Sequence, residues 1–562
     1  MRFFAPTMAE LLTYMEEIGG TIEDYRKILP YAIDTAQKDT VWLIPEFPTN
    51  TEHEPLHEPT LREKKLIKKL NDIHSPLSLH KHSFTEKQHY TLTENKLFTI
   101  NSKLRTILLG RLLLLDELPF SLHEIHAHVS QGMITYEQGV VYEDYRYSCK
   151  RCGNNKQSMF ATFSCYRCKD ECTYCRSCIM MGRVTTCTPL LRWTEKIEEE
   201  TRTIHTLQWH GTLSFFQKKA SSKLTDIISA MKENTETLHA ECLIWAVCGA
   251  GKTEMLFEGI QLALNSGLKI AVATPRTDVV LELEPRFKEA FPETHIHAFY
   301  GGADDKYAQA EFVISTTHQL LRFYKAFNIV IIDEVDAFPY SYDEKLRYAV
   351  AKAKKDDSLT VYVTATPEKK MKERAELGIL PCMKVARRYH RYPLPVPHYL
   401  WVGNWEKKLK KNALPFQVVL WINEKMSLGK QVFLFVPTVK VMKQVVDCLS
   451  RYIQVEVEGV HASDECRREK VLKFRKGDIK VLVTTTILER GVTVKGVQVA
   501  VLGADDRIFT ESALVQISGR VGRSPDEPGG DVVFFHHGKT NAMVEARKHI
   551  VRMNKLGEAE LQ

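Results

Sequence analysis

The sequence of 562 residues contains no apolar run long enough to cross a membrane. Its strongest apolar run, residues 106–115, is short and carries Arg111, whereas a spanning helix needs about 18 or more apolar residues. The N-terminus has neither a long apolar segment nor a small-residue cleavage signal, which argues against a secretory signal peptide. We therefore expect a cytoplasmic protein with no transmembrane segment of its own.

The sequence also lacks an internal repeat and a strong excess of one charge. Its net charge at pH 7 is +7, a mildly basic value that by itself favours a nucleic-acid partner only weakly. A chain of this length is too long for a single hydrophobic core. Its length predicts about three or four domains.

From about residue 207, short runs rich in valine, isoleucine and alanine alternate with amphipathic helical stretches. Such runs occupy residues 243–247, 270–273, 329–332 and 361–363. A stretch with three prolines at 392–397 interrupts the pattern, and a second series follows at 432–436, 481–483 and 499–502. Continuous apolar runs separated by helices are typical of a parallel sheet covered on both faces. The sequence therefore predicts two α/β lobes joined by a linker.

A glycine-rich loop follows the first of these apolar runs and precedes a helix expected to begin near Thr253. Glycines in such a loop let backbone N–H groups wrap around phosphates. A lysine there reaches the β and γ phosphates, and a hydroxyl ligates Mg²⁺. We predict that Lys252 and Thr253 have these two roles in an ATP site. The loop consists of Ala246, Val247, Cys248, Gly249, Ala250, Gly251, Lys252 and Thr253.

Two carboxylates follow the apolar run at 329–332. They are Asp333 and Glu334, and the end of a parallel strand is where α/β folds bind ligands. A carboxylate there can hold Mg²⁺, and a second one can orient and deprotonate the attacking water. We predict that Asp333 binds Mg²⁺ together with Thr253 and that Glu334 is the catalytic base.

These motifs resemble those of the superfamily 2 helicases over about residues 207–525. Ala246 stands where the general phosphate-loop pattern has glycine, and alanine there matches this superfamily. Residues 516–523 have the pattern Q-x-x-G-R-x-G-R, which resembles the superfamily's last motif. The resemblance implies that Arg520 and Arg523 face the phosphates when the lobes close. Arginine fingers of this kind raise the rate by about 10³ to 10⁵.

The other superfamily motifs appear in the same order, and each alone is a weak signal. The resemblance implies that Gln217 contacts adenine, because an amide can bind its edge with two hydrogen bonds. Trp209 nearby either stacks on the base or belongs to the core. Coupling roles are implied for Asp336, Thr364, Thr366, Arg490, Gly491 and Gln516. Strand contacts that ignore base identity are implied for Pro275, Arg276, Thr316, Thr317, Thr438, His461, Thr484 and Thr485.

Eight of the thirteen cysteines lie between residues 149 and 187. A CxxC turn points two sulfurs at one ion, and two such turns complete a tetrahedral Zn²⁺ site. The eight thiols are therefore enough for two zinc ions. Buried unpaired thiols and an iron–sulfur cluster are alternatives, although the separation of the CxxC pairs favours zinc. The cysteines are Cys149, Cys152, Cys165, Cys168, Cys172, Cys175, Cys178 and Cys187.

The cysteine-rich segment in front of the helicase motifs narrows the resemblance. Residues 149–153 (CKRCG) and 174–183 (YCRSCIMMGR) are similar to ComFA, the competence ATPase family of Gram-positive bacteria, and the resemblance covers nearly the full chain. The family's four-cysteine zinc motif corresponds to Cys149, Cys152, Cys175 and Cys178. Cys165, Cys168, Cys172 and Cys187 exceed that pattern and form a candidate second zinc site.

The resemblance implies an ATPase stimulated by single-stranded DNA that helps draw transforming DNA through a membrane channel. Its implied partners are single-stranded DNA and competence proteins including that channel, and its implied place is the inner face of the cell membrane. The motifs leave two other functions open. One is a replication-restart helicase of the primosomal kind, or an RNA helicase. The other is a nucleotide-switched zinc scaffold that binds DNA without moving along it.

We thus predict an α/β protein with two tandem RecA-like parallel-sheet lobes. A cysteine-rich zinc module and an N-terminal region of mixed structure precede them. In the N-terminal region we expect a helix near residues 8–18 and a basic amphipathic helix at 62–70, for which a solvated helix face is the simpler explanation. The expected boundaries are 1–145 for the N-terminal region, 146–192 for the zinc module, 193–392 for the first lobe, 393–398 for the linker and 399–562 for the second lobe.

Overall fold

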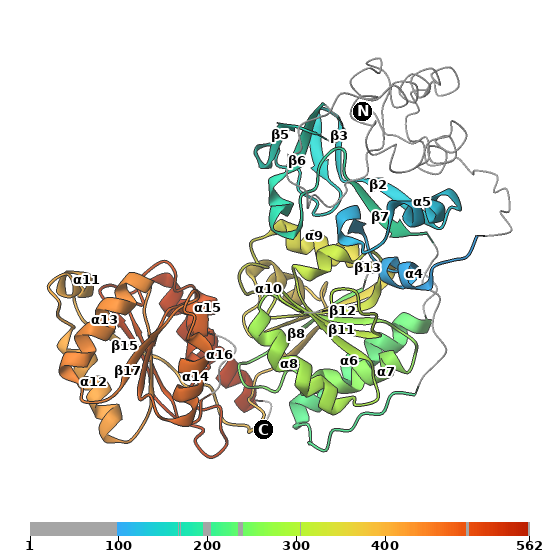
Figure 1. Ribbon diagram of the computed structural model, residues 1–562. Helices are drawn as coiled ribbons and strands as arrows, with labels where there is room; N and C mark the ends of the chain where they lie inside the picture. The colour runs from blue at the N-terminus through green and yellow to red at the C-terminus, as the bar shows by residue number, and fades with distance from the viewer. Residues whose placement is uncertain are drawn as a thin grey trace.

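The computed structural model describes residues 98–166, 168, 170–194, 204–233, 240–303, 305–489 and 494–559. The helices expected near residues 8–18 and at 62–70 lie outside these residues, as do Arg490 and Gly491. Two parallel sheets form two lobes, and a smaller module built of antiparallel strands precedes them (Figure 1). The predicted pair of RecA-like lobes behind a cysteine-containing segment is thus confirmed.

The first lobe is a seven-stranded parallel sheet in the order β10-β11-β9-β12-β13-β8-β14. Successive residues of its central strands enter two different cores. Ile270 and Val272 of β9 pack with α7 and α8, whereas Ala271 and Ala273 pack with α9. Both faces are therefore covered by helices, which is why the strands are continuously apolar.

The strands of this lobe are β8 (Ala240–Ala246), β9 (Ile270–Thr274), β10 (Ile296–Phe299), β11 (Phe312–Thr316), β12 (Phe327–Asp333), β13 (Lys354–Thr364) and β14 (Cys382–Val385). Its helices are α6 (Phe215–Glu233), α7 (Phe257–Leu264), α8 (Thr277–Ala290), α9 (Glu344–Ala353) and α10 (Lys369–Glu376).

The second lobe is a six-stranded parallel sheet in the order β15-β20-β19-β16-β18-β17. Its strands are β15 (His398–Trp401), β16 (Val432–Phe435), β17 (Val457–Val460), β18 (Val481–Thr484), β19 (Gln498–Leu502) and β20 (Val532–His536). Its helices are α11 (Trp405–Leu409), α12 (Phe416–Ser427), α13 (Val439–Tyr452), α14 (Arg467–Lys476), α15 (Glu511–Ser518) and α16 (Asn541–Ala559).

The connection between the two sheets runs through residues 386–397, which form neither helix nor strand. The C-terminal helix α16 is tied to this connection. The side chain of Asn554 accepts a hydrogen bond from Leu394 N at 2.8 Å and donates one to Leu394 O at 2.9 Å. Figure 1 shows α16 on the side of the second lobe that faces the first.

The module in front of the lobes is one folded unit, because its early strands pair with its last. β1 (Leu113–Leu114) and β2 (Ile134–Gln138) both pair with β7 (Pro189–Trp193). Two hairpins, β3–β4 (Val140–Glu143, Arg146–Cys149) and β5–β6 (Phe160–Ser164, Glu171–Cys175), and the segments that follow them carry the clustered cysteines. Helices α4 (Ser102–Leu108) and α5 (Leu122–Ser130) complete the module.

Arg111 fastens this module to the first lobe. Its guanidinium is 2% exposed, donates to Tyr307 O at 2.9 Å and lies 5.3 Å from the centre of the Phe323 ring. Burial lowers its pKa to about 10, and carbonyl acceptors together with an aromatic face are what a buried guanidinium requires. Among the helices that the structure describes, none is long and apolar enough to span a bilayer.

Candidate nucleotide cleft and cysteine clusters

The glycine-rich loop leaves the sheet at the carboxyl end of β8. Gly249 and Gly251 have φ values of +79° and +69°, in the left-handed region that favours glycine. A Cβ on Gly251 would lie 2.4 Å from Gln217 Nε2, so a side chain there would displace the Gln217 amide. The helix predicted near Thr253 begins as a 3₁₀ turn at Glu254–Leu256 and continues as α7.

Gln217 is held against this loop. Its side chain is 4% exposed, accepts a hydrogen bond from Ser214 N at 2.8 Å and donates one to Ala250 O at 2.9 Å. The amide thus positions the phosphate loop in this conformation, and its contact with adenine stays a prediction. Trp209 packs edge-on against Phe257, with ring centres 5.6 Å apart, and also lines the cleft described below.

Asp333 is the last residue of β12, and Glu334 follows it with a φ of +58°. Asp333 Oδ1 accepts a hydrogen bond from Glu334 N at 3.0 Å. A left-handed conformation in a residue other than glycine costs on the order of 1–3 kcal/mol and occurs mainly at functional sites. The turn aims the Glu334 side chain into the same space as the phosphate loop.

One cleft of about 640 Å³ brings the predicted ATP residues together. From the first lobe it is lined by the phosphate loop with Lys252 and Thr253, and by Asp333 and Glu334. From the second lobe it is lined by Gln516, Arg520 and Arg523. Lys252 and Arg523 lie 271 positions apart in the sequence, and the two lobes jointly enclose the cleft.

The second-lobe arginines follow helix α15, whose end presses on the phosphate loop. Arg520 is 1% exposed, and its Nε donates to Glu489 O at 3.0 Å. Burial lowers the pKa of Arg520 well below its usual value, and the neighbouring charge of Arg523 lowers it further. Cys248 Sγ donates to Gln516 Oε1 at 3.0 Å, and a Cβ on Gly519 would meet the Cys248 side chain at 2.4 Å.

Asp336 is the centre of a hydroxyl cluster that joins the lobes. Its carboxylate accepts hydrogen bonds from Thr364 and Thr366 of the first lobe, each at 2.5 Å. It accepts a third, also at 2.5 Å, from Ser512 on α15 of the second lobe. The structure therefore brings the predicted coupling residues Asp336, Thr364 and Thr366 together and adds Ser512 to them.

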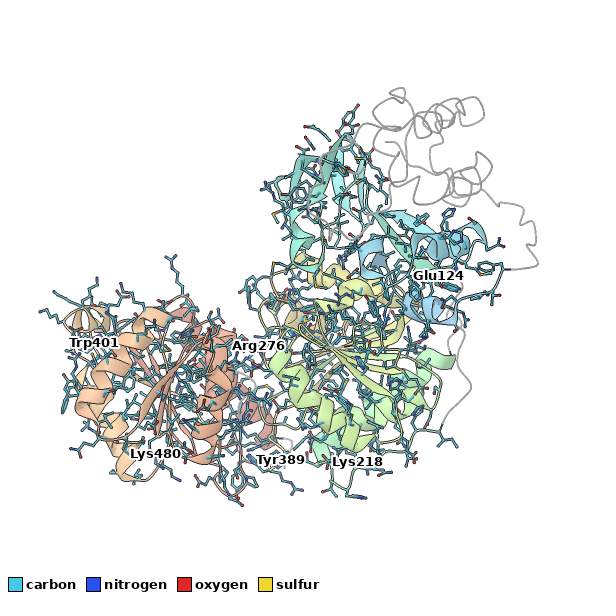
Figure 2. The ribbon with its side chains drawn as sticks, in the orientation of Figure 1. Glu124, Lys218, Arg276, Tyr389, Trp401 and Lys480 are labelled. Atoms are coloured by element: carbon cyan, nitrogen blue, oxygen red, sulfur yellow. The ribbon has the colours of Figure 1, made fainter. Side chains whose placement is uncertain are left out.

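The residues predicted to contact a nucleic-acid strand all lie at the carboxyl ends of strands or just after them. Arg276 is engaged across the lobes, since its guanidinium donates to Ile487 O at 3.0 Å and lies 3.4 Å from Glu489 Oε1. Figure 2 shows Arg276 where the two lobes face each other. Buried side chains are those of Pro275, Thr316, Thr317 and Thr484, whereas His461 and Thr485 are half-buried and Thr438 is exposed. Their contact with a strand stays a prediction.

The eight clustered cysteines form two separate groups. Cys149, Cys152, Cys175 and Cys178 make one group, and Cys165, Cys168, Cys172 and Cys187 make the other. Within each group all four sulfurs lie within 4.8 Å of one another. The division is the one drawn from the sequence.

Both groups fit a tetrahedral metal site. Zinc–sulfur bonds of about 2.3 Å place two sulfurs roughly 3.8 Å apart. The Sγ atoms of Cys149 and Cys178, of Cys152 and Cys175, and of Cys165 and Cys187 are each 3.7 Å apart. Cys168 and Cys172 are closer, at 3.0 Å. All-sulfur donor sets with these spacings are compatible with zinc.

The module that carries the first cysteine group lies beside helix α9 of the first lobe (Figure 1). Tyr348 Oη donates to Lys150 O at 3.0 Å, and Lys352 Nζ donates to Arg151 O at 2.8 Å. Burial lowers the pKa of Lys352 to about 8. Gly153 has a φ of +71°, and a Cβ there would lie 2.4 Å from the Tyr348 ring. The cysteine module is thus attached to the first lobe through α9, the helix that precedes β13.

Some residues of the site escape sequence reasoning. Ser512 stands outside the Q-x-x-G-R-x-G-R pattern, and nothing in its neighbours marks it. Arg388 lies in the connection between the lobes, where the following prolines suggest only a linker. Both act through partners more than 100 residues away.

The two lobes and their shared cleft define a helicase-like ATPase of superfamily 2. Residues 212–369 match the family described as type III restriction enzyme, res subunit, and residues 412–525 match the helicase conserved C-terminal domain. Residues 93–192 match the competence protein ComFA N-terminal domain. The chain belongs to the ComFA family and is a competence-associated enzyme that hydrolyses ATP.

Full-length relatives support this membership. The chain is 49% identical to competence protein ComFA of Bacillus subtilis (strain 168), over 82% of this chain and 96% of that protein. It is 37% identical to competence protein ComFA of Streptococcus pneumoniae (strain ATCC BAA-255 / R6), over 68% of this chain and 86% of that protein. A solved structure of S. cerevisiae Dbp5 bound to RNA and ADP BeF3 is 16% identical over 62% of this chain and 98% of that chain, with a TM-score of 0.44.

Proposed function

We propose that this protein is an ATP-dependent translocase on single-stranded DNA that helps drive transforming DNA across the cytoplasmic membrane. The observation that carries the proposal is the shared cleft. Lys252, Asp333 and Glu334 come from one lobe, and Arg520 and Arg523 come from the other. Hydrolysis in such a cleft depends on the relative orientation of the two lobes. This dependence couples ATP hydrolysis to movement of one lobe against the other.

The cleft residues divide the work of phosphoryl transfer. Lys252 binds the β and γ phosphates, and Glu334 orients the attacking water and accepts its proton. Arg520 and Arg523 stabilise the charge that builds on the transferred phosphoryl group. Thr253 and Asp333 are the residues that would hold Mg²⁺, which would neutralise negative charge on the phosphates.

Two cross-lobe contacts suit the coupling of hydrolysis to the strand. One is the bond from Ser512 to Asp336, three residues after Asp333. The other is the pairing of Arg276 with Glu489, whose carbonyl oxygen holds Arg520. A change in lobe position alters both contacts together. Glu489 therefore links Arg276, which we expect to contact the strand, to Arg520, which we expect to face the phosphates.

We further propose that both cysteine groups hold Zn²⁺. The sulfur spacings support this, as does the burial of all four thiols of the first group. The competence names of the relatives support a role in DNA uptake, with the membrane DNA channel and other competence proteins as partners. Those partners would bring the protein to the inner face of the membrane.

The test compares ATP hydrolysis without nucleic acid and with single-stranded DNA, duplex DNA and RNA. We expect the largest stimulation with single-stranded DNA and none in Lys252→Ala. Displacement of streptavidin from biotinylated single-stranded DNA measures movement directly. The proposal fails if single-stranded DNA does not stimulate turnover, or if turnover is stimulated but no displacement occurs.

Failure in displacement alone would favour the nucleotide-switched scaffold. Stimulation by RNA or by forked DNA above that by single strands would favour one of the other helicase functions. Uptake is tested separately, by transformation of the host carrying Lys252→Ala. We expect transformation to be lost, and transformation at the unaltered frequency would contradict the role in uptake.

A further inference from the structure

We propose that Arg388 is a positioning residue that holds the loop of Arg520 and Arg523 in register with the phosphate loop. The inference rests on the proposed catalytic role of those two arginines. Arg388 belongs to the connection between the lobes, and none of the sequence motifs includes it.

The fold brings this connection to the phosphate loop. Strand β14 pairs in parallel with β8, and Val385 stands opposite Ala246. The chain therefore leaves β14 at the point where the phosphate loop leaves β8. The two segments stay together beyond the sheet, because Val247 N donates to Val385 O at 3.0 Å and Tyr389 N donates to Gly249 O at 3.0 Å.

The Arg388 side chain packs against the phosphate loop from behind. A Cβ on Gly249 would lie 3.7 Å from Arg388 Cγ and 3.8 Å from its Nε, which is ordinary van der Waals contact. Tyr389, unlike Arg388, lines the ATP cleft. Figure 2 shows Tyr389 at the junction between the two lobes. Residues 388 and 389 thus both contact the phosphate loop at Gly249.

The guanidinium of Arg388 reaches the second lobe. It donates from Nη1 to Gly522 O and, more weakly, from Nη2 to Gly519 O at 3.5 Å. These two glycines flank Arg520 and precede Arg523. A Cβ on Gly522 would lie 2.9 Å from Arg388 Nη1, so the glycine permits the close approach. His390 Nε2 lies 3.1 Å from the same Gly522 oxygen.

The buried charge of Arg388 indicates that this side chain does more than fill space. The side chain is 1% exposed, and among the described residues its hydrogen-bond acceptors are backbone carbonyls and no carboxylate pairs with it. Burial and the nearby charge of Arg523 lower its pKa to about 10. An uncompensated buried charge is costly, and an apolar side chain would fill the space without that cost.

A polyanion in the cleft removes this cost. Arg388, Arg520 and Arg523 place three positive charges around a loop built to wrap phosphates. Bound nucleotide therefore stabilises the arrangement, and the gain grows as negative charge builds on the phosphoryl group. Arg388 does not line the cleft itself. Its effect reaches the reaction through the backbone of residues 519–522.

Removal of Arg388 should accordingly change the rate and leave nucleotide binding nearly intact. A misplacement of about 1 Å in a catalytic group can cost on the order of 10²-fold in rate. We expect Arg388→Ala to lower kcat by about 100-fold, with KM for ATP changed by less than about threefold. Arg388→Lys keeps a positively charged donor nitrogen, but a single nitrogen cannot contact both carbonyl oxygens as the guanidinium does. Its kcat should therefore lie between that of the unaltered protein and that of Arg388→Ala.

Arg387→Ala is the matched control. Arg387 is the preceding residue and is also buried, at 6% exposure. Its contacts are with α16 and the linker, namely Glu558 at 3.9 Å and Arg391 O at 3.3 Å. We expect Arg387→Ala to keep kcat within about threefold of the unaltered protein.

The second readout is affinity for ADP with aluminium fluoride, which imitates the phosphoryl group in transfer, against affinity for ADP alone. The unaltered protein should prefer the mimic strongly, and Arg388→Ala should lose most of that preference while it keeps its affinity for ADP. Equal losses for both ligands, or an unchanged kcat, would overturn the proposal. If Arg388→Ala does not fold, the same comparison is made with Arg388→Lys.

These measurements are made without DNA as well as with it. A protein that hydrolyses ATP normally but is not stimulated by single-stranded DNA would contradict the translocase and leave the role of Arg388 standing. Normal stimulation and movement in Arg388→Ala would contradict the role of Arg388 and leave the translocase standing.

Discussion

The hydroxyl of Ser512 in the second lobe donates a hydrogen bond of 2.5 Å to the carboxylate of Asp336 in the first lobe. Asp336 lies three residues after Asp333 and two after Glu334, at the sheet edge where the cleft opens. The same carboxylate accepts from Thr364 and Thr366. A contact that depends on the relative position of the lobes therefore lies two residues from Glu334, the predicted catalytic base.

Ser512→Ala tests that bond. Hydrogen bonds to charged groups contribute roughly 1.5–3 kcal/mol, and 1.4 kcal/mol corresponds to about tenfold in rate. We expect turnover stimulated by single-stranded DNA to fall about tenfold, while turnover without DNA falls less, because the bond acts between lobes. Steady-state ATPase assays measure both. The control is Ser450→Ala on α13, where the exposed hydroxyl donates to Val446 O of its own helix at 2.9 Å. Equal reductions with and without DNA would contradict a coupling role.

Glu334→Gln separates chemistry from binding. The amide keeps the shape of the carboxylate but cannot accept the proton of the attacking water, and general-base catalysis contributes about 10²–10⁴-fold. We expect turnover to fall by that order while ATP still binds, as measured by nucleotide fluorescence. Glu293→Gln changes an exposed carboxylate outside the cleft and should have no effect. Turnover above a tenth of the unaltered rate would exclude Glu334 as the base.

Arg523→Ala distinguishes a motor from a scaffold. An arginine finger contributes about 10³–10⁵ in rate, so we expect turnover to fall at least 10³-fold with ATP binding kept within a few fold. Transformation of the host should be lost with it. Arg451→Ala, an exposed arginine at the end of α13, is the control. Transformation that survives the loss of turnover would support the nucleotide-switched scaffold.

Metal analysis tests the two cysteine groups. We expect two zinc ions per chain, falling to one in Cys152→Ser and to one in Cys187→Ser. The control is Cys466→Ser, which removes an exposed cysteine outside both groups. One zinc in the unaltered chain would exclude the second site, and iron in place of zinc would exclude the metal assignment. Because thiolates must lose protons to bind, zinc affinity should fall as the pH falls.

The two groups should differ in their effect on stability. The first rests on α9 through Tyr348 and Lys352, whereas the second lies on the β5–β6 hairpin and the loop before β7. We therefore expect Cys152→Ser to lower the melting temperature more than Cys187→Ser. The reverse order would show that the first group does not support the ATPase lobe.

The ionisation of Glu511, at the boundary between the lobes, should make the stability of the protein depend on pH. A hydrogen bond from His549 lowers the pKa of Glu511 to about 2, and the charge of Lys372 contributes, although burial opposes it. Because the folded pKa lies below the ordinary value of 4.5, the stabilisation is fully present above about pH 4.5 and is lost as the pH falls toward 2. Glu511 is about a third exposed, so solvent screening reduces the contribution to on the order of 1 kcal/mol.

Melting temperatures measured from pH 7 to pH 3.5 check this dependence. Glu511→Gln should melt below the unaltered protein near neutral pH, and the difference should shrink below about pH 4.5. Glu545→Gln on α16, which removes an exposed carboxylate paired with Lys548 at 2.9 Å, should show no such trend. A difference that is constant over this range would contradict the assignment to Glu511 ionisation.

The sequence alone determined the architecture and which first-lobe residues line the shared cleft. Continuous apolar runs such as 270–273 and 329–332 are covered on both sides and so must be strands of a parallel sheet. The phosphate loop and Asp333-Glu334 are each local, because a few consecutive residues at the end of one strand supply all the chemistry. The CxxC spacing predicted metal-binding thiols, and the division into these two groups came from the family resemblance, which the structure matches.

Only the tertiary structure decided how the second lobe completes the site. Ser512 meets Asp336 across 176 residues, and Arg388 meets Gly522 across 134. No local pattern marks such contacts, because each partner is an ordinary serine, arginine or glycine in its own segment. Arg276, which its motif predicts to contact a strand, also pairs with Glu489 of the other lobe, and its strand contact stays a prediction. These pairings depend on the angle between two separately folded sheets, and that angle is a property of the packed interface and not of any stretch of sequence.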